Sequence, residues 1–194
     1  MKKVVKFGGS SLASTRQFKK AGEIVRSDKT RRYVVPSAPG KRNDKDEKVT
    51  DMLYACYDAA SAGTAYKKLL NRIKDRYLEI IDGLGLNLNL DYEFDRIEEN
   101  FVKGAGRDYA ASRGEYLNGL VMASYLGYEF IDAAEVIFFD ALGNFESDTT
   151  NKELSERLAH VERAVIPVFY GSIHDGTIKT FSRGGSDVTC SIVA

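Results

Sequence analysis

The chain of 194 residues lacks the features that several classes of protein need. Its 28 Lys and Arg residues balance its 28 Asp and Glu residues, so no net field favours nucleic acid or an anionic membrane. Its apolar runs are far too short to span a membrane, and no charged start followed by an apolar stretch indicates a signal peptide. These absences favour a cytoplasmic protein that binds neither nucleic acid nor membrane.

Residues that bind metals or carry redox chemistry are equally scarce. The two cysteines, Cys56 and Cys190, fit no metal or redox spacing, which indicates a reduced chain. His160 and His174 have no Cys or His partner at ligand spacing, so we expect both on the surface. The sequence therefore predicts no metal site made by protein side chains.

What the chain does have is enough apolar sequence for one domain with a core, because 43% of its residues are hydrophobic. Short apolar runs predict strands at residues 3–7, 33–35, 130–131, 136–139 and 164–170, and a hairpin at 172–181. Apolar residues at helical spacing predict helices at 16–26, 51–62, 66–82, 94–101, 112–126 and 151–163. We expect most of the charged residues 41–48 to form a solvated loop. Alternating strands and helices predict an α/β domain whose mostly parallel sheet is sandwiched by helices.

Two glycine-rich segments, KFGGSS at residues 6–11 and SRGGSD at 182–187, carry most of the chemical information. Each follows a strand-like run, precedes a helix-like run and contains one cation. Glycine lets a phosphate approach the backbone, and the N–H groups at a helix start point at a bound anion. A glycine pair is also typical of ordinary tight turns. Neither segment matches the P-loop or the dinucleotide-binding pattern G-x-G-x-x-G, so those classes are disfavoured.

The second segment adds charges of both signs, since Arg183 and Asp187 flank its glycines. A guanidinium binds a carboxylate through two parallel hydrogen bonds, and an aspartate binds an ammonium group. Together they would suit an α-amino acid, which carries both groups. The same spacing also fits a surface ion pair that contributes little, and spacing alone leaves both interpretations open.

A third candidate, Glu115, lies in the segment SRGE at residues 112–115. We expect this segment at the start of a helix, where a glutamate in the first turn is explained by the helix dipole and by capping. A role for Glu115 in binding a substrate therefore needs support from elsewhere.

Together these segments resemble the aspartate kinases of the amino-acid kinase family. The resemblance covers essentially the whole chain and includes VPSA at residues 35–38, SRGEYL at 112–117, residues 127–137 and FSRGGSDVT at 181–189. SRGGSD with an upstream SRGE is specific to aspartate kinases, whereas KFGG is shared more widely among their relatives. The resemblance implies the amino-acid kinase fold, which is similar to that of carbamate kinase.

By the same resemblance, the protein transfers the γ-phosphoryl group of ATP to the side-chain carboxylate of L-aspartate. The product, 4-phospho-L-aspartate, is the first intermediate in the synthesis of lysine, threonine and methionine. The implied cofactors are ATP and Mg²⁺, with the metal on the nucleotide phosphates. We also expect a homo-oligomer, because a shortened family domain would leave a strand edge or an apolar patch uncovered.

The resemblance also assigns roles to individual residues. Lys6 would offset charge in the transition state, and Asp187 would orient Lys6. Asp187 would also bind the aspartate ammonium group together with Glu115, while Arg183 would bind the α-carboxylate. The residues implied to line the phosphates are Gly8, Gly9, Ser10, Gly184 and Gly185. Those implied to line the amino-acid pocket are Ser37, Thr50, Phe169 and Ser186.

Two departures from the family pattern matter. Val168 stands where the family usually has a glycine, and its side chain would narrow the edge of the pocket. The family also continues well past SRGGSD with a nucleotide-binding portion and ACT regulatory domains. We therefore expect residues 1–194 to form the amino-acid-binding, N-terminal part of a truncated catalytic domain with little activity alone. The alternatives are a kinase for glutamate or acetylglutamate, or a non-catalytic fragment that binds aspartate.

Overall fold

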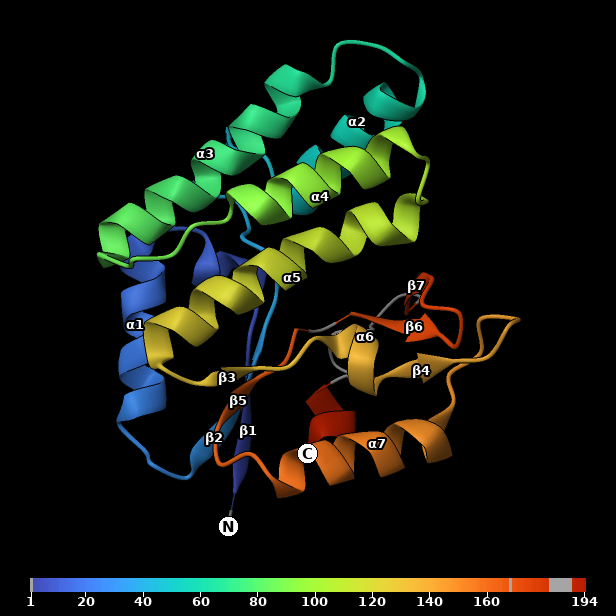
Figure 1. Cartoon of the computed structure of the whole chain (residues 1–194). Helices are drawn as coiled ribbons and strands as arrows, with labels where there is room; N and C mark the ends of the chain where they lie inside the picture. Colours follow the sequence, from blue (N-terminus) through green and yellow to red (C-terminus); the bar gives the residue numbers. More distant parts are fainter. Residues whose placement is uncertain (1, 168, 182–189) are drawn as a thin grey trace.

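A computed structural model describes residues 2–167, 169–181 and 190–194 (Figure 1). Its larger sheet has four parallel strands in the order β1-β2-β5-β3. These strands are β1 (Lys3–Phe7), β2 (Arg31–Pro36), β5 (Ala164–Val165) and β3 (Glu129–Phe130). The predicted α/β class and the mostly parallel sheet are confirmed.

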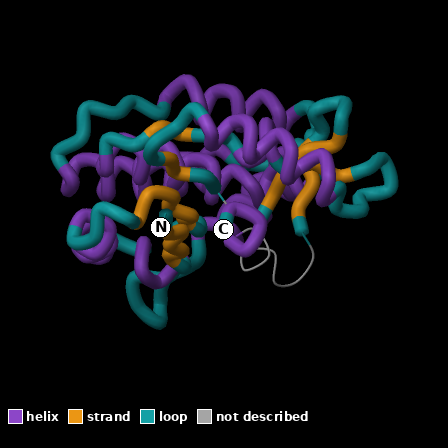
Figure 2. Tube along the Cα trace, turned by 90° about the horizontal axis from the view of Figure 1, so that it is seen from below, coloured by secondary structure: helices purple, strands orange, loops and turns teal. Residues whose placement is uncertain are grey.

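A smaller sheet lies apart from the first, as the two groups of strands in Figure 2 show. Its order is β4-β6-β7, with strands β4 (Phe138–Phe139), β6 (Tyr170–Ile173) and β7 (Ile178–Thr180). Strands β4 and β6 are parallel, whereas β6 and β7 form the predicted antiparallel hairpin. Gly176 supplies the positive φ of +86° in the hairpin turn.

Helices flank both sheets, and four of them form one layer above the strands in Figure 1. The helices of that layer are α2 (Val49–Ser61), α3 (Lys67–Leu84), α4 (Asp91–Val102) and α5 (Arg107–Leu126). The other elements are η1 (Gly9–Leu12), α1 (Thr15–Arg26), α6 (Ala133–Val136) and α7 (Ser147–Ala159). Among the described helices, none is both long enough and apolar enough to cross a membrane.

Helix α5 runs through the core. Its residues Leu117, Val121 and Met122 are fully buried, and the helix contacts strands of both sheets as well as helices α2 and α4. The structure corrects its predicted start at residue 112, because α5 begins at Arg107 and Gly106 is its N-cap. Glu115 therefore lies in the middle of a buried helix, and neither capping nor the helix dipole explains it.

Two predicted strands are wrong in detail. The apolar run 164–170 divides into β5 and the start of β6, which belong to different sheets. Phe169 lies between them with φ of +83°, a conformation that interrupts a strand. The run 136–139 also divides, because Val136 ends α6, whose N-cap Asp132 accepts a hydrogen bond from Ala134 N. Apolar runs of this length do not reveal such breaks.

Candidate functional site

Two loops meet where strands β1 and β2 end. Phe7 and Pro36 are partners in the sheet, and the next residue, Ser37, donates a backbone hydrogen bond of 2.9 Å to Phe7 O. We call residues 8–14 the β1 loop and residues 37–40 the β2 loop. Gly40 N donates to Gly9 O at 2.8 Å, so the two loops are joined directly. The carboxyl edge of a parallel sheet is where ligands of α/β proteins commonly bind.

The glycines of these loops serve two purposes. A Cβ on Gly9 would lie 2.8 Å from Ala38 O, and one on Gly40 would lie 2.7 Å from Gly9 C. Both therefore permit the close contact between the loops. In contrast, a Cβ on Gly8 would meet no heavy atom within 4 Å, and Gly8 and Ser10 are exposed. This side of the β1 loop leaves its backbone accessible to a bound anion.

Helix α5 packs directly against the β2 loop. A Cβ on Gly114 would lie 2.7 Å from the Ala38 side chain, so only glycine allows this approach. One residue on, Glu115 Oε1 accepts a hydrogen bond of 3.2 Å from Ala38 N. Asn118 Nδ2 donates to Ser37 O at 2.6 Å. The loop and the helix face thus share a set of polar contacts.

Two buried oxygen atoms on this helix face lack a hydrogen-bond partner within the described part of the chain. They are Glu115 Oε2 and Asn118 Oδ1, and the residues are 7% and 0% exposed. Residues three apart on a helix lie side by side, so the two acceptors share a face. Buried acceptors without a donor destabilise a fold unless a ligand satisfies them. A ligand with several N–H donors is the complementary group.

The carboxyl group of Glu115 has an unusual acidity. Burial raises its pKa from 4.5 to about 7, although the hydrogen bond from Ala38 N and the charge of Arg113 oppose the rise. Near neutral pH the group is therefore divided between its protonated and ionised forms. A cationic ligand would favour the ionised form and bind to it.

Arg113, in the same SRGE segment, is a buried cation held by aromatic rings. Its guanidinium lies 4.6 Å, 4.4 Å and 5.5 Å from the ring centres of Tyr109, Tyr116 and Tyr170. Its Nε donates to Ser112 Oγ at 3.0 Å. These contacts connect α5 to β6 and fix the helix that carries Glu115.

The remaining described candidates lie around the same edge. Lys6 is half-buried in β1, and Phe7 separates it from the β1 loop. Thr50 lies in the first turn of α2, and that turn is attached to the β2 loop because Val49 N donates to Pro39 O at 3.1 Å. Phe169 follows β5, the sheet neighbour of β2.

The other predicted site residues, with Val168, lie outside the described residues: Arg183, Gly184, Gly185, Ser186 and Asp187. Phe181, which precedes their segment, donates a backbone hydrogen bond of 2.9 Å to Phe169 O. The contact of Lys6 with Asp187 stays a prediction.

Comparison with known proteins identifies the family. Residues 1–194, the whole chain, match the amino acid kinase family. The chain belongs to this family. The fold implied by the sequence motifs is therefore confirmed. The β1 and β2 loops are loops of an amino acid kinase.

Several relatives of this amino acid kinase are aspartokinases. Aspartokinase 3 of Bacillus subtilis is 37% identical over 211 residues, which cover 99% of this chain and 45% of that protein. The crystal structure of Clostridium acetobutylicum aspartate kinase is 50% identical with a TM-score of 0.94, over 98% of this chain and 44% of that one. Escherichia coli aspartokinase III, solved with aspartate and ADP, shares the fold at 24% identity, with a TM-score of 0.80 over 98% of this chain and 46% of its own. The chain spans about 45% of the length of these relatives.

Sequence reasoning about this amino acid kinase missed Asn118 and the backbone N–H of Ala38. A signal for Asn118 exists, because it follows Glu115 by three residues and so shares its helix face. No sequence pattern points to a single backbone N–H. Within the described residues, no group of three or more His, Cys, Asp or Glu side chains could hold a metal ion.

Proposed function

We propose that this chain is the amino-acid-binding, N-terminal part of the catalytic domain of an aspartate kinase. The reaction transfers the γ-phosphoryl group of ATP to the side-chain carboxylate of L-aspartate and yields 4-phospho-L-aspartate and ADP. In the cell this reaction would begin lysine, threonine and methionine synthesis in the cytoplasm. The aspartokinase relatives support the choice of reaction.

One observation carries the proposal: Glu115 and Asn118 each bond to the β2 loop through one side-chain atom, and their buried acceptors, Glu115 Oε2 and Asn118 Oδ1, have no partner in the described structure. An α-ammonium group has three N–H donors and a positive charge, so it satisfies both oxygens. Its charge also offsets the cost of ionising Glu115 in a buried place. Of the two charged ends of an α-amino acid, the ammonium is therefore the end that fits here.

The transfer needs positioning and charge stabilisation more than proton transfer. The aspartate side chain is already ionised at neutral pH, so its oxygen can attack the γ-phosphorus without a general base. As that bond forms, the bond from the γ-phosphorus to the bridging oxygen breaks and ADP leaves. Lys6, at the end of β1, would offset the charge that two anions bring together.

The β1 loop is the part of the described structure that would receive the nucleotide phosphates. Gly8 and Ser10 are exposed and Gly8 has open space beside it, which fits the approach of a phosphate. In this proposal Gly9 assists, with Gly184 and Gly185 from the second segment. Mg²⁺ would be bound mainly by the phosphate oxygens and would neutralise part of their charge.

Calorimetric titration of the chain with L-aspartate and with succinate tests the proposal. Succinate keeps both carboxylates but lacks the ammonium group, so we expect it to bind at least about 100-fold more weakly near pH 8. L-Glutamate and N-acetyl-L-glutamate test other substrates, and the acetylated compound also lacks an ammonium group. Equal binding of succinate and L-aspartate, or tighter binding of N-acetyl-L-glutamate, would contradict the proposal.

A further inference from the structure

A second buried charge holds the two loops from the side of helix α3. The side chain of Arg76 is 6% exposed and ion-pairs through Nη1 with Asp46, whose side chain is 10% exposed. Its Nη2 donates to Ala13 O at 3.1 Å and to Gly40 O at 3.0 Å. Ala13 belongs to the β1 loop and Gly40 to the β2 loop. One nitrogen atom of Arg76 therefore joins both loops.

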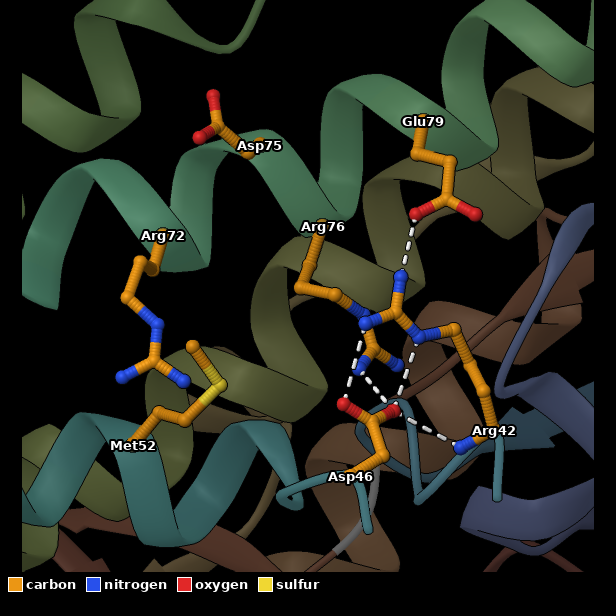
Figure 3. Close-up of a pocket in the computed structure, with 7 residues that line it drawn as sticks. All are labelled: Arg42, Asp46, Met52, Arg72, Asp75, Arg76 and Glu79. Atoms are coloured by element: carbon orange, nitrogen blue, oxygen red, sulfur yellow. Dashed lines mark hydrogen bonds and ion pairs between the residues drawn. The ribbon is translucent and has the colours of Figure 1, made fainter.

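Asp46 is itself fixed by the charged segment 41–48, which the sequence predicted to be a solvated loop. Its carboxylate accepts from Arg42 N and Arg42 Nε, each at 2.9 Å, and from Arg42 Nη2 at 3.1 Å. Arg42 also pairs with Glu79 at 2.6 Å, one turn after Arg76 on α3 (Figure 3). The segment is thus attached to α3 at three points, because Glu47 also pairs with Arg72. Seven of its eight residues are exposed, as predicted, and Asp46 is the exception.

The pocket around these residues does not have the charge of an anion-binding site. Its volume is about 190 Å³, and three arginines and three carboxylates line it: Arg42, Arg72, Arg76, Asp46, Asp75 and Glu79. Figure 3 shows the Asp46 carboxylate joined to both Arg42 and Arg76, so these two cations already have an anion. The arrangement is suited to holding backbone in place.

We propose that Arg76 is a positioning residue that fixes the separation of the β1 and β2 loops for catalysis. The inference rests on the proposed function. In that function Gly8 of the β1 loop, Lys6 of the preceding strand and Ser37 of the β2 loop belong to one site. Arginine suits this task because its rigid, planar fork presents several N–H groups in fixed directions. A lysine would keep the charge, but its single nitrogen atom could not reproduce the three contacts that Arg76 makes through Nη1 and Nη2.

The test compares Arg76→Met and Arg76→Lys with Arg72→Met. Arg72 lies one turn earlier on α3 and lines the same pocket, but its side chain is 55% exposed and contacts Glu47 instead of the loops. Two readouts are measured on the chain: the L-aspartate Kd by calorimetry, and hydrogen exchange of the Gly40 amide, which bonds to Gly9 O. Thermal melting reports general stability.

We expect Arg76→Met to weaken L-aspartate binding about tenfold or more and to speed exchange at Gly40 by a similar factor. Arg76→Lys should give a smaller change in both, and Arg72→Met should change neither. If Arg76→Met does not fold, Arg76→Lys decides the question. A lower melting temperature with unchanged Kd and unchanged Gly40 exchange would overturn the inference.

The result also separates this inference from the proposed function. If the unmodified chain binds no L-aspartate, the proposed function fails, and the effect of Arg76 on the loops is then judged by Gly40 exchange alone. If the unmodified chain binds L-aspartate and the Arg76 variants bind it equally well, only the inference fails.

Discussion

Helices α3 and α5 both bury polar side chains against the β2 loop, but the hydrogen-bonding needs of these side chains are met differently. On α3, the charge of Arg76 has a carboxylate partner and two backbone carbonyls, although its Nε atom has no hydrogen bond. On α5, the carboxylate of Glu115 receives one backbone hydrogen bond and has no ion-pair partner among the described residues. One buried charge is thus paired within the protein, and the other is available to a ligand.

This difference separates support from binding. A paired buried charge holds backbone, and breaking the pair leaves an isolated charge that destabilises the fold. An unpaired buried acceptor lowers stability while the site is empty and contributes when a complementary ligand arrives. The two helices should therefore respond in opposite directions when their buried charges are removed.

The largest loss of unfolding free energy is expected when the buried ion pair of α3 is broken. Asp46→Ala leaves Arg76 buried without a carboxylate, so the free energy of unfolding should fall by about 3 kcal/mol or more at neutral pH. Hydrogen bonds and ion pairs with Arg42 and Arg76 hold the pKa of Asp46 well below its ordinary value. Its contribution is therefore present at neutral pH and is lost as the pH falls below about 4. Urea unfolding across that range measures both effects.

Glu79→Ala is the matched control for that measurement. Glu79 pairs with Arg42 in the same network, but its side chain is 55% exposed. We expect a loss of at most about 1 kcal/mol, because exposed ion pairs contribute little. Equal losses for Asp46→Ala and Glu79→Ala would mean that the buried pair does not hold the loops.

On the α5 side, removing the buried charge is expected to raise the free energy of unfolding instead of lowering it. Because the pKa of Glu115 is raised from 4.5 to about 7, the folded state keeps a proton that the unfolded chain releases between these values. Stability therefore falls as the pH rises through this range. Glu115→Gln removes that dependence and should raise the free energy of unfolding near pH 8 by roughly 2–3 kcal/mol.

Urea unfolding of both proteins at about pH 5 and pH 8 measures the prediction, since their stabilities should differ less at the lower pH. The same substitution should abolish measurable L-aspartate binding. A variant that is less stable near pH 8 and still binds L-aspartate would reverse the roles assigned to the two helices.

The sequence predicted the elements of the fold better than their ends. Alternating apolar runs and helical stripes located the strands of the main sheet and the helices of the overlying layer, because burial of one face leaves a clear periodicity. The start of α5 was missed because, apart from Tyr109, residues 107–111 carry charged and small side chains, and because Gly106 rather than Ser or Asp is its N-cap. That error concealed the buried position of Glu115.

The site was predictable only as far as residue types and motifs reveal it. Glycine pairs and Lys6 stood out because such groups suit a bound phosphate, whereas Glu115 was assigned a role only by the resemblance to aspartate kinases. Arg76 and Asp46 did not, since they lie 30 residues apart in stretches that look like solvated charge. Only the fold brings them together, and no local pattern distinguishes a charge that is paired in the core from one on the surface.

A smaller effect is expected where α5 meets the β2 loop. Gly114→Ala favours the helix by about 1 kcal/mol, but its methyl group would lie 2.7 Å from Ala38 Cβ and displace the loop. We expect a net loss of about 1 kcal/mol in unfolding free energy and weaker L-aspartate binding, measured by urea unfolding and calorimetry. The double variant Gly114→Ala, Ala38→Gly removes the clash. If it does not restore binding, the contact between Gly114 and Ala38 does not position the site.

The smallest effect sharpens the comparison most, because Arg72 and Arg76 differ in exposure and in whether they contact the loops. They lie one turn apart on α3, line the same pocket and each pairs with a carboxylate of segment 41–48. Arg72 and its partner Glu47 are each 55% exposed, so water compensates for the lost pair in Arg72→Met. We expect urea unfolding to show a change within about 0.5 kcal/mol. A loss as large as that of Asp46→Ala would show that pairing with the charged segment matters irrespective of burial, and the distinction between the two helices would then need another physical basis.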